Sequence, residues 1–162
     1  MQVHSGAMRY WLLKTEPSDY SFADLQSEPS GTVWDGVKNY AALKYLRDME
    51  RGDRAFVYHT GNQRRIVGIA DVTSDAYPDP NAGDERMMVV DLAAVEPLEQ
   101  PVALADLRDE EAFADHPLLT QGRLSVMELS PDLWERVLAM AGHEPAAGES
   151  GRSKRRPRMD ER

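Results

Sequence analysis

Short strand-like segments, rather than long helical ones, fill most of this chain and most restrict its fold. Each is rich in Val, Ile, Leu, Tyr or Trp and is bounded by Pro, Gly, Asn or Asp, which favour turns. Five such segments cover 9–15, 54–60, 65–74, 87–95 and 123–129. Because strands need partners and a covered face, we predict a small α+β domain built on a curved, barrel-like sheet with short flanking helices.

Helix signals lie between the strand segments. Asn39 is a favourable N-cap for a helix that we expect to run to about Met49, with apolar residues at helical spacing. Ser130 followed by Pro131 opens another helix as an N-cap and a first-turn proline. Residues 61–63, between two strand segments, predict the turn of a β-hairpin.

The remaining connections are expected to be short. A capping box at 21–24 predicts a brief helix over 22–25, and 104–107 predicts a second one. Residues 27–32 contain Pro and Gly and are predicted to be a loop. We also predict a loop over 76–81, because its two prolines cannot donate ladder hydrogen bonds.

Composition is that of one soluble globular domain. The 162 residues are 41% hydrophobic and 29% charged, enough for a buried core. No apolar run approaches the roughly 18–20 residues of a membrane-spanning helix, and no basic-then-apolar leader opens the chain. The absence of Cys excludes disulfides and thiolate zinc sites and fits a reducing cytoplasm, where we expect the protein to act.

Both ends are expected to lie outside a folded domain at 8–142. Residues 1–7 are polar and glycine-containing, so we treat them as an expression remnant or as sequence before an alternative start at Met8. Residues 143–162 combine Pro, Gly, Ser, Arg and Lys with almost no apolar side chains. We predict that this basic tail is disordered.

Charge is unevenly distributed along a chain of net charge −9. Residues 36–67 hold seven basic and three acidic side chains, whereas 68–149 hold four basic and eighteen acidic ones. A protein that grips many phosphates is usually basic overall, because counterion release drives such binding. A local basic surface suits a short nucleic-acid segment or a single nucleotide; an ordinary solvated helix face is the alternative for 36–67.

Two segments place polar groups beside aromatic ones. The apolar strand at 10–13 breaks into Lys14, Thr15 and Glu16 before a proline, and 34–40 supplies a tryptophan, a glycine and a helix start. These groups suit a flat, polar ligand such as a nucleobase, because stacking on an aromatic ring contributes about 1–3 kcal/mol per base. A purely structural role is the alternative.

The chain resembles the EVE domain family from about Met8 to Ala141. The motifs that carry the resemblance are YWLLKTEP at 10–17, WDGV at 34–37, NYA at 39–41, GD at 52–53, YH at 58–59, VGIA at 67–70, AYPDP at 76–80 and RLSV at 123–126. The resemblance implies a PUA-like fold, a small curved β-barrel with flanking short helices. The related YTH domain reads methylated adenine in an aromatic cage, and EVE domains are implicated in recognising modified bases, notably modified cytosine in DNA.

The resemblance implies that this chain is a nucleic-acid-binding module for a modified, flipped nucleobase in DNA or RNA, with modified cytosine in DNA the preferred reading. Flipping is required because a base inside a duplex hides its faces and its pairing edge. Trp34 would be the stacking wall of the pocket, with polar contacts from Thr15 and Ser125. The oligomeric state is left open, and no membrane partner is implied.

Three further residues are candidate base contacts. Asn39 has two possible roles, because its side chain can cap a helix N–H or bond a base edge. Tyr58 and His59 are consecutive strand residues that point oppositely, so at most one should face a given pocket. Candidate phosphate contacts, for which ordinary surface charge is the alternative, are Lys14, Lys38, Lys44, Arg64 and Arg65.

An enzymatic role has weaker support. The four His residues are scattered without metal-ligand spacing, and there is no Gly-rich phosphate loop or nucleophile elbow, so no metal, cofactor or catalytic residue is predicted. The best enzyme hypothesis is an ASCH-like amidohydrolase that uses Lys14, Thr15 and Glu16 on an acylated pyrimidine nucleoside. Strand alternation opposes it, because three consecutive side chains cannot all face one substrate. A protein-interaction module with an acidic surface is a third possibility.

Overall fold

The computed structural model describes residues 8–143. The expected remnant at 1–7 and the expected basic tail, apart from His143, lie outside the described residues.

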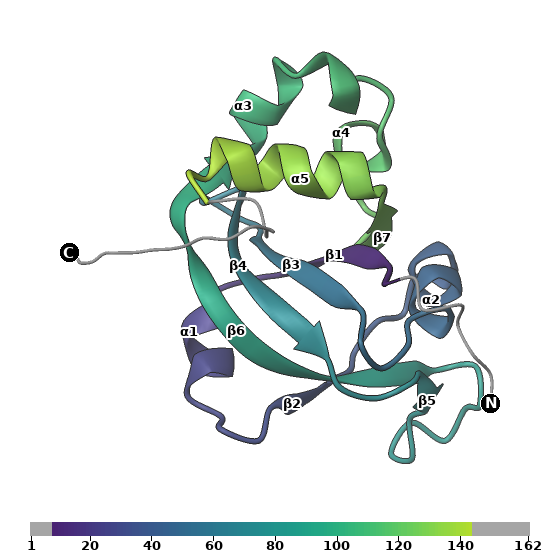
Figure 1. The fold of residues 1–162 in the computed structure, drawn as a ribbon. Coiled ribbons are helices and arrows are strands. Elements are labelled where there is room, and N and C mark those ends of the chain that lie inside the picture. Colours follow the sequence, from purple (N-terminus) through teal and green to yellow (C-terminus); the bar gives the residue numbers. More distant parts are fainter. Residues whose placement is uncertain (1–7, 144–162) are drawn as a thin grey trace.

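Within the described residues, seven strands form one mixed sheet that curls into a half-barrel (Figure 1). Their bounds are β1 (Tyr10–Thr15), β2 (Thr32–Trp34), β3 (Arg54–His59), β4 (Arg65–Val72), β5 (Tyr77–Pro78), β6 (Met88–Ala103) and β7 (Val126–Leu129). The strand order is β2-β6-β4-β3-β1-β7, with β5 paired to β6. This arrangement confirms the predicted α+β, PUA-like fold.

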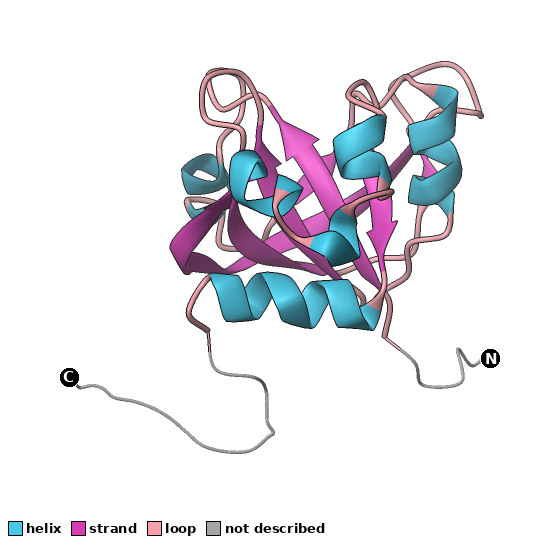
Figure 2. Ribbon diagram, turned by 90° about the horizontal axis from the view of Figure 1, so that it is seen from above, coloured by secondary structure: helices cyan, strands magenta, loops and turns pink. Residues whose placement is uncertain are grey.

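Short helices flank the sheet, as Figure 2 shows from above. They are α1 (Phe22–Gln26), α2 (Tyr40–Arg47), α3 (Leu104–Arg108), α4 (Pro117–Thr120), α5 (Pro131–Met140) and a 3-10 turn at Glu111–Phe113. The predicted caps at Ser21, Asn39 and Ser130 are confirmed, since each side chain accepts a backbone N–H of its helix. No helix among residues 8–143 is long and apolar enough to cross a membrane.

The sheet is mixed because β1 pairs in different directions with its two neighbours. β1 runs parallel to β3 and antiparallel to β7, and the predicted hairpin of β3 and β4 is confirmed as an antiparallel pair. Helix α5 covers this part of the sheet, because the Trp134 ring stacks on Phe56 at 3.8 Å and on Tyr10 at 4.5 Å between ring centroids. Trp11 and Trp134 are both buried, as expected of core residues.

The strand expected at 87–95 is much longer in the structure. β6 continues to Ala103, through Pro97 and Pro101, and curves along the sheet between β2 and β4 (Figure 1). Its pairing with β4 shifts register twice, on either side of Gly68. Such bulges bend a strand, and proline is tolerated at or beside them. The prolines therefore mark the curvature of the barrel rather than the end of the strand.

Other predicted boundaries differ from those in the structure, and the strand expected at 123–129 begins only at Val126. The loop expected at 27–32 is confirmed as far as Gly31, after which Thr32 begins β2, and the loop expected at 76–81 contains β5. Both strands are too short for alternation to be recognised along the chain, and each exists only by pairing with β6. Helix α2 ends at Arg47 rather than near Met49.

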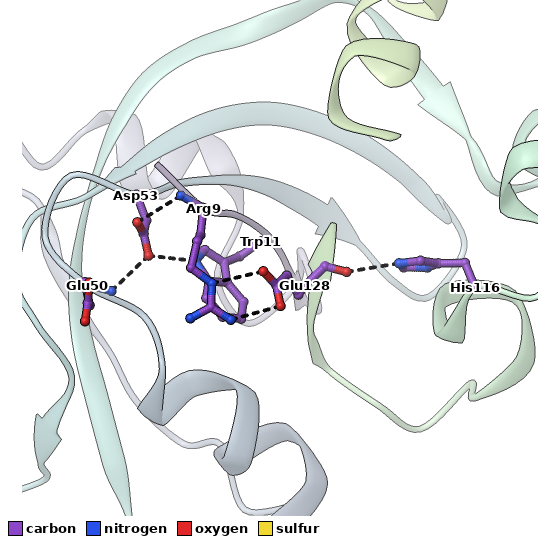
Figure 3. Close-up of polar contacts among 6 residues, drawn as sticks. All are labelled: Arg9, Trp11, Glu50, Asp53, His116 and Glu128. Atoms are coloured by element: carbon purple, nitrogen blue, oxygen red, sulfur yellow. Dashed lines mark hydrogen bonds and ion pairs between the residues drawn. The ribbon is translucent and has the colours of Figure 1, made fainter. Parts of the chain in front are cut away.

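A buried carboxylate joins the start of β1 to the turn before β3 (Figure 3). Asp53, 4% exposed, accepts hydrogen bonds from Trp11 Nε1 at 2.9 Å, from the Glu50 backbone N–H at 3.0 Å and from the Arg9 backbone N–H at 3.2 Å. The Arg9 side chain then binds Glu128 of β7 through two contacts of 3.0 Å. The network holds three sheet segments in register at the end of β1 that lies away from Thr15.

The opposite end of β1 is fixed by α1. His59 Nε2 accepts the Phe22 backbone N–H at 3.0 Å, which ties the first turn of α1 to the end of β3. The Phe22 ring packs where Gly68 has no side chain, since a Cβ there would lie 2.4 Å from the ring. Thr15 of β1 also donates to the Tyr20 carbonyl at 2.6 Å, so the segment before α1 lies beside the end of β1.

Candidate functional site

A cavity of about 410 Å³ opens where the curled sheet does not close on itself. It is lined by the end of β1, by Tyr20, by the segment 32–38 and by Ser125 just before β7. β2 and β7 are the two edge strands, so the curl of the sheet brings their ends to one cavity. The volume is in the lower part of the range of about 300–1,000 Å³ found for small-ligand sites.

The cavity brings together five of the residues that the sequence singled out. They are Lys14, Thr15, Trp34, Lys38 and Ser125. Ser125 lies beside β1 because its carbonyl accepts the Lys14 backbone N–H at 2.9 Å, which continues the pairing of β1 with β7. Helix α2, which follows Lys38, contacts both β6 and β7 and so lies across the same opening.

An aromatic pair forms one wall of the cavity. Trp34 is 8% exposed, and its ring meets the Tyr20 ring edge-on, at 6.1 Å between centroids and 80° between planes. Alternation along β2 turns Val33, which is 45% exposed, away from the face that carries Thr32 and Trp34. A flat ligand in the cavity can therefore reach an indole that the surrounding core holds in place.

Sequence reasoning did not identify Tyr20. Thr15 Oγ1 donates to the Tyr20 carbonyl at 2.6 Å and fixes this residue against the end of β1. The Tyr20 hydroxyl donates to Glu28, and burial together with this bond raises the pKa of Tyr20 to about 12. The signal available in the sequence was an aromatic residue directly before the capping box at 21–24.

Lys14 supplies a half-buried cation at the cavity. Its Nζ donates to the Gly122 carbonyl at 3.3 Å and lies 5.7 Å from the centroid of the Tyr58 ring. Burial lowers the pKa of Lys14 and raises that of Tyr58, while the charges of Arg64 and Arg108 act to lower the pKa of Tyr58. Tyr58 thus lies behind Lys14, within the field of two further cations.

The other candidate base contacts lie outside the cavity lining. Asn39 Oδ1 accepts the Ala42 N–H at 3.0 Å as the N-cap of α2. Tyr58 is buried, and so is His59, whose Nδ1 lies 2.8 Å from Gln63 Oε1. Lys44 is exposed on α2, Arg64 is exposed in the turn between β3 and β4, and Arg65 is exposed at the start of β4.

Strand alternation predicted opposite directions for Lys14 and Thr15, yet both line the cavity. The cavity reaches both side chains because it lies at the point where β1 ends. Glu16 lies outside the lining and accepts hydrogen bonds from the Ser18 N–H at 3.2 Å and its hydroxyl at 3.1 Å. The three residues are not assembled as an amidohydrolase cluster. Among residues 8–143, no group of side chains is suited to a metal ion.

Known proteins resemble the chain over nearly all of its described length. Thymocyte nuclear protein 1 of Rattus norvegicus is 30% identical over 170 residues, which cover 85% of this chain and 75% of the relative. A structure from Agrobacterium tumefaciens is 34% identical with a TM-score of 0.81 and covers 89% of this chain and 99% of that one.

A third match has a ligand. The structure of human THYN1 protein in complex with DNA containing 5-methylcytosine is 29% identical, with a TM-score of 0.75, and covers 85% of this chain and 99% of that one. The family model of the EVE domain matches residues 9–140. The chain therefore belongs to the EVE domain family.

Proposed function

We propose that this protein binds DNA that carries a modified cytosine and holds the base, flipped from the strand, in the cavity against Trp34. The observation that carries the proposal is the cavity itself, which combines an aromatic wall, hydroxyl groups and two lysines at one opening. The DNA complex of the human relative, which matches this chain over most of its length, supports the same ligand class.

Different residues of the cavity would bind different parts of the nucleotide. The indole of Trp34 offers a stacking surface, which contributes about 1–3 kcal/mol for a base regardless of its sequence. Thr15 and Ser125 supply hydroxyl groups to the lining, although the proton of Thr15 is committed to the Tyr20 carbonyl. Lys14 and Lys38 add positive charge to the lining, which would favour the phosphates on either side of a flipped nucleotide.

The uneven charge of the chain favours a short contact with DNA. Unstacking and unpairing a base costs a few kcal/mol, and the cost is smallest for modified, mismatched or single-stranded sites. A protein of net charge −9 gains little from counterion release over a long duplex. Its affinity must therefore come mainly from the cavity, and this favours selection by the flipped base itself.

The test is a binding panel of short DNA oligonucleotides of one sequence with a central cytosine, 5-methylcytosine or thymine. Wild-type protein should prefer the modified cytosine to cytosine. Trp34→Ala should weaken binding of the modified oligonucleotide by about 5- to 150-fold, the range for one stacked base. Trp34→Phe, which keeps an aromatic ring, should retain most of the affinity.

The matched control is Leu138→Ala in α5. Leu138 has the same 8% exposure as Trp34 and belongs to the same core, but it does not line the cavity. It should lower the melting temperature without changing base preference. Equal affinity of wild type for all three oligonucleotides, or equal losses for Trp34→Ala and Leu138→Ala, would refute the proposal.

A further inference from the structure

Helix α2 carries an aromatic ring and two cations on one exposed side. Tyr40, Lys44 and Arg47 follow one another at helical spacing, so they lie on the same side of the helix, and all three residues are exposed. The residues that α2 buries project from a different side and belong to the core. We call Tyr40, Lys44 and Arg47 together the exposed face of α2.

Tyr40 is the most exposed of the large apolar residues in the part of the chain that the structure describes. It is 58% exposed, whereas Met8, Val33 and Val95 are 38–45% exposed. Single exposed apolar side chains are common on protein surfaces. Tyr40 differs from an ordinary one because its ring is supported by a neighbouring loop.

The loop before β6 supports one face of the Tyr40 ring. The guanidinium carbon of Arg86 lies 5.5 Å from the ring centroid, and Asp84 holds that guanidinium with hydrogen bonds of 3.1 and 3.0 Å. Arg47 donates to the Arg86 carbonyl at 3.3 Å, which joins the loop to α2. A ring that is held in this way loses little freedom when a ligand stacks on its open side.

Lys44 and Arg47 have charges that no carboxylate neutralises within residues 8–143. The arginines that form ion pairs with carboxylates there are Arg9, Arg54, Arg86 and Arg136. Arg47 contacts only a carbonyl, and Lys44 has no ion pair in the same part of the chain. Both side chains are therefore free to bind an anion such as a phosphate.

The exposed face of α2 begins next to the cavity. Lys38 lines the cavity, and Tyr40 follows it by two residues, so the two Cα atoms lie within about 7.6 Å of each other. A DNA strand whose flipped base occupies the cavity can therefore continue over this face. An aromatic ring together with cations is the combination that binds single-stranded nucleic acid, because the ring stacks a base and the cations hold the backbone.

We propose that the exposed face of α2 binds single-stranded nucleotides on one side of the flipped base, with a neighbouring base stacked on Tyr40 and phosphates held by Lys44 and Arg47. The inference rests on the proposed function and deepens it by naming a second contact with the same strand. It predicts a one-sided requirement for flanking nucleotides, because α2 leaves the cavity lining in one direction only.

The test uses three single-stranded DNA oligonucleotides that carry 5-methylcytosine at the centre, at the 5′ end or at the 3′ end, with binding measured by fluorescence anisotropy. One of the two end positions lacks the nucleotides that reach α2. Tyr40→Ala should weaken binding of the other two strands by about five- to tenfold, the lower part of the range for one stacked base, and leave that strand unchanged. Tyr40→Phe, which keeps the ring, should bind all three as wild type does.

The cations are tested through the salt dependence of binding to the central strand. Lys44→Gln and Arg47→Gln should each reduce the slope of log affinity against log salt concentration by about 0.7, the value for one phosphate of a single strand. The matched control is Arg136→Gln on α5, which removes an exposed charge that is paired with Glu110 at 2.6 Å, so the slope should not change. Val95→Ala, at an exposed apolar residue of β6 outside the cavity lining, is the control for Tyr40→Ala.

Equal effects of Tyr40→Ala on all three strands, or no effect on any, would overturn the inference. Slopes that Lys44→Gln and Arg47→Gln leave unchanged would also overturn it. If Trp34→Ala weakened all three strands in either case, the proposed cavity would stand without this second contact. If Trp34→Ala weakened none of them, the proposed function would fail together with the inference.

Discussion

Replacement of Asp53 by Ala should destabilise the fold strongly. The carboxylate accepts three hydrogen bonds, and one donor, Trp11 Nε1, belongs to a fully buried side chain. Without Asp53 this indole N–H has no partner, and a buried unsatisfied donor costs about 1–3 kcal/mol. The backbone N–H groups of Arg9 and Glu50 are only partly buried, so water replaces some of what they lose.

Together these losses should lower the free energy of unfolding by about 2–5 kcal/mol. That is a large share of the roughly 5–15 kcal/mol that stabilises a typical domain. The measurement is equilibrium unfolding in urea, followed by circular dichroism. Asp53→Asn keeps an acceptor oxygen of the same size, and we expect it to lose less than Asp53→Ala.

The control is Asp71→Ala, which removes a carboxylate from an ion pair with Arg54 at 3.0 Å near the surface. Such pairs contribute about 0–1 kcal/mol, so the variant should unfold close to the wild-type midpoint. If Asp53→Ala and Asp71→Ala shifted the midpoint equally, the hydrogen bonds of Asp53 would not make the predicted contribution to the free energy of unfolding.

Three further predictions concern single residues. Burial lowers the pKa of His116, so on acidification the unfolded chain takes up a proton before the folded one does, and stability should fall as the pH drops below 6.5. Thermal melts from about pH 7 to about pH 5 should show this loss of stability. The loss should be smaller for His116→Asn, which keeps a helix cap but cannot take up the proton. Burial also lowers the pKa of Lys14 from its usual value of 10.5, so as the pH rises this side chain loses its charge before it reaches that value. Wild-type affinity for an adenine- and cytosine-only oligonucleotide, measured by fluorescence anisotropy, should therefore fall as the pH approaches that value, whereas Lys14→Arg should retain it. Gly68→Ala would place a Cβ 2.4 Å from the Phe22 ring and should cost about 1–3 kcal/mol in unfolding experiments.

Local patterns predicted the elements that are long or clearly capped. Alternation and turn residues located β1, β3 and β4, and the caps located α1, α2 and α5. They did not locate β2 or β5, which have no stability as isolated segments and form only against β6. The length of β6 was missed because a proline normally ends a strand, whereas Pro97 lies opposite Gly68 of β4 beside a shift of register.

The residues of the candidate site could be predicted only in part from the sequence. The resemblance to the EVE family pointed to Trp34, Thr15 and Ser125, which share a cavity in the structure. Sequence reasoning could not find Tyr20 or Glu28, because their relation to the cavity depends on how the segment before α1 folds back on β1. Asn39 has a local role as a helix cap that its position in the sequence already favoured.

The most direct test of the account is to locate the base in the complex. A DNA oligonucleotide with 5-iodocytosine in place of the modified cytosine can be cross-linked by light to a neighbouring aromatic side chain, and the attached peptide can be identified by mass spectrometry. The account predicts attachment at Trp34 or Tyr20, with loss of the cross-link when unlabelled 5-methylcytosine DNA competes. Attachment confined to peptides from the exposed face of α2 or from the turn between β3 and β4 would contradict it.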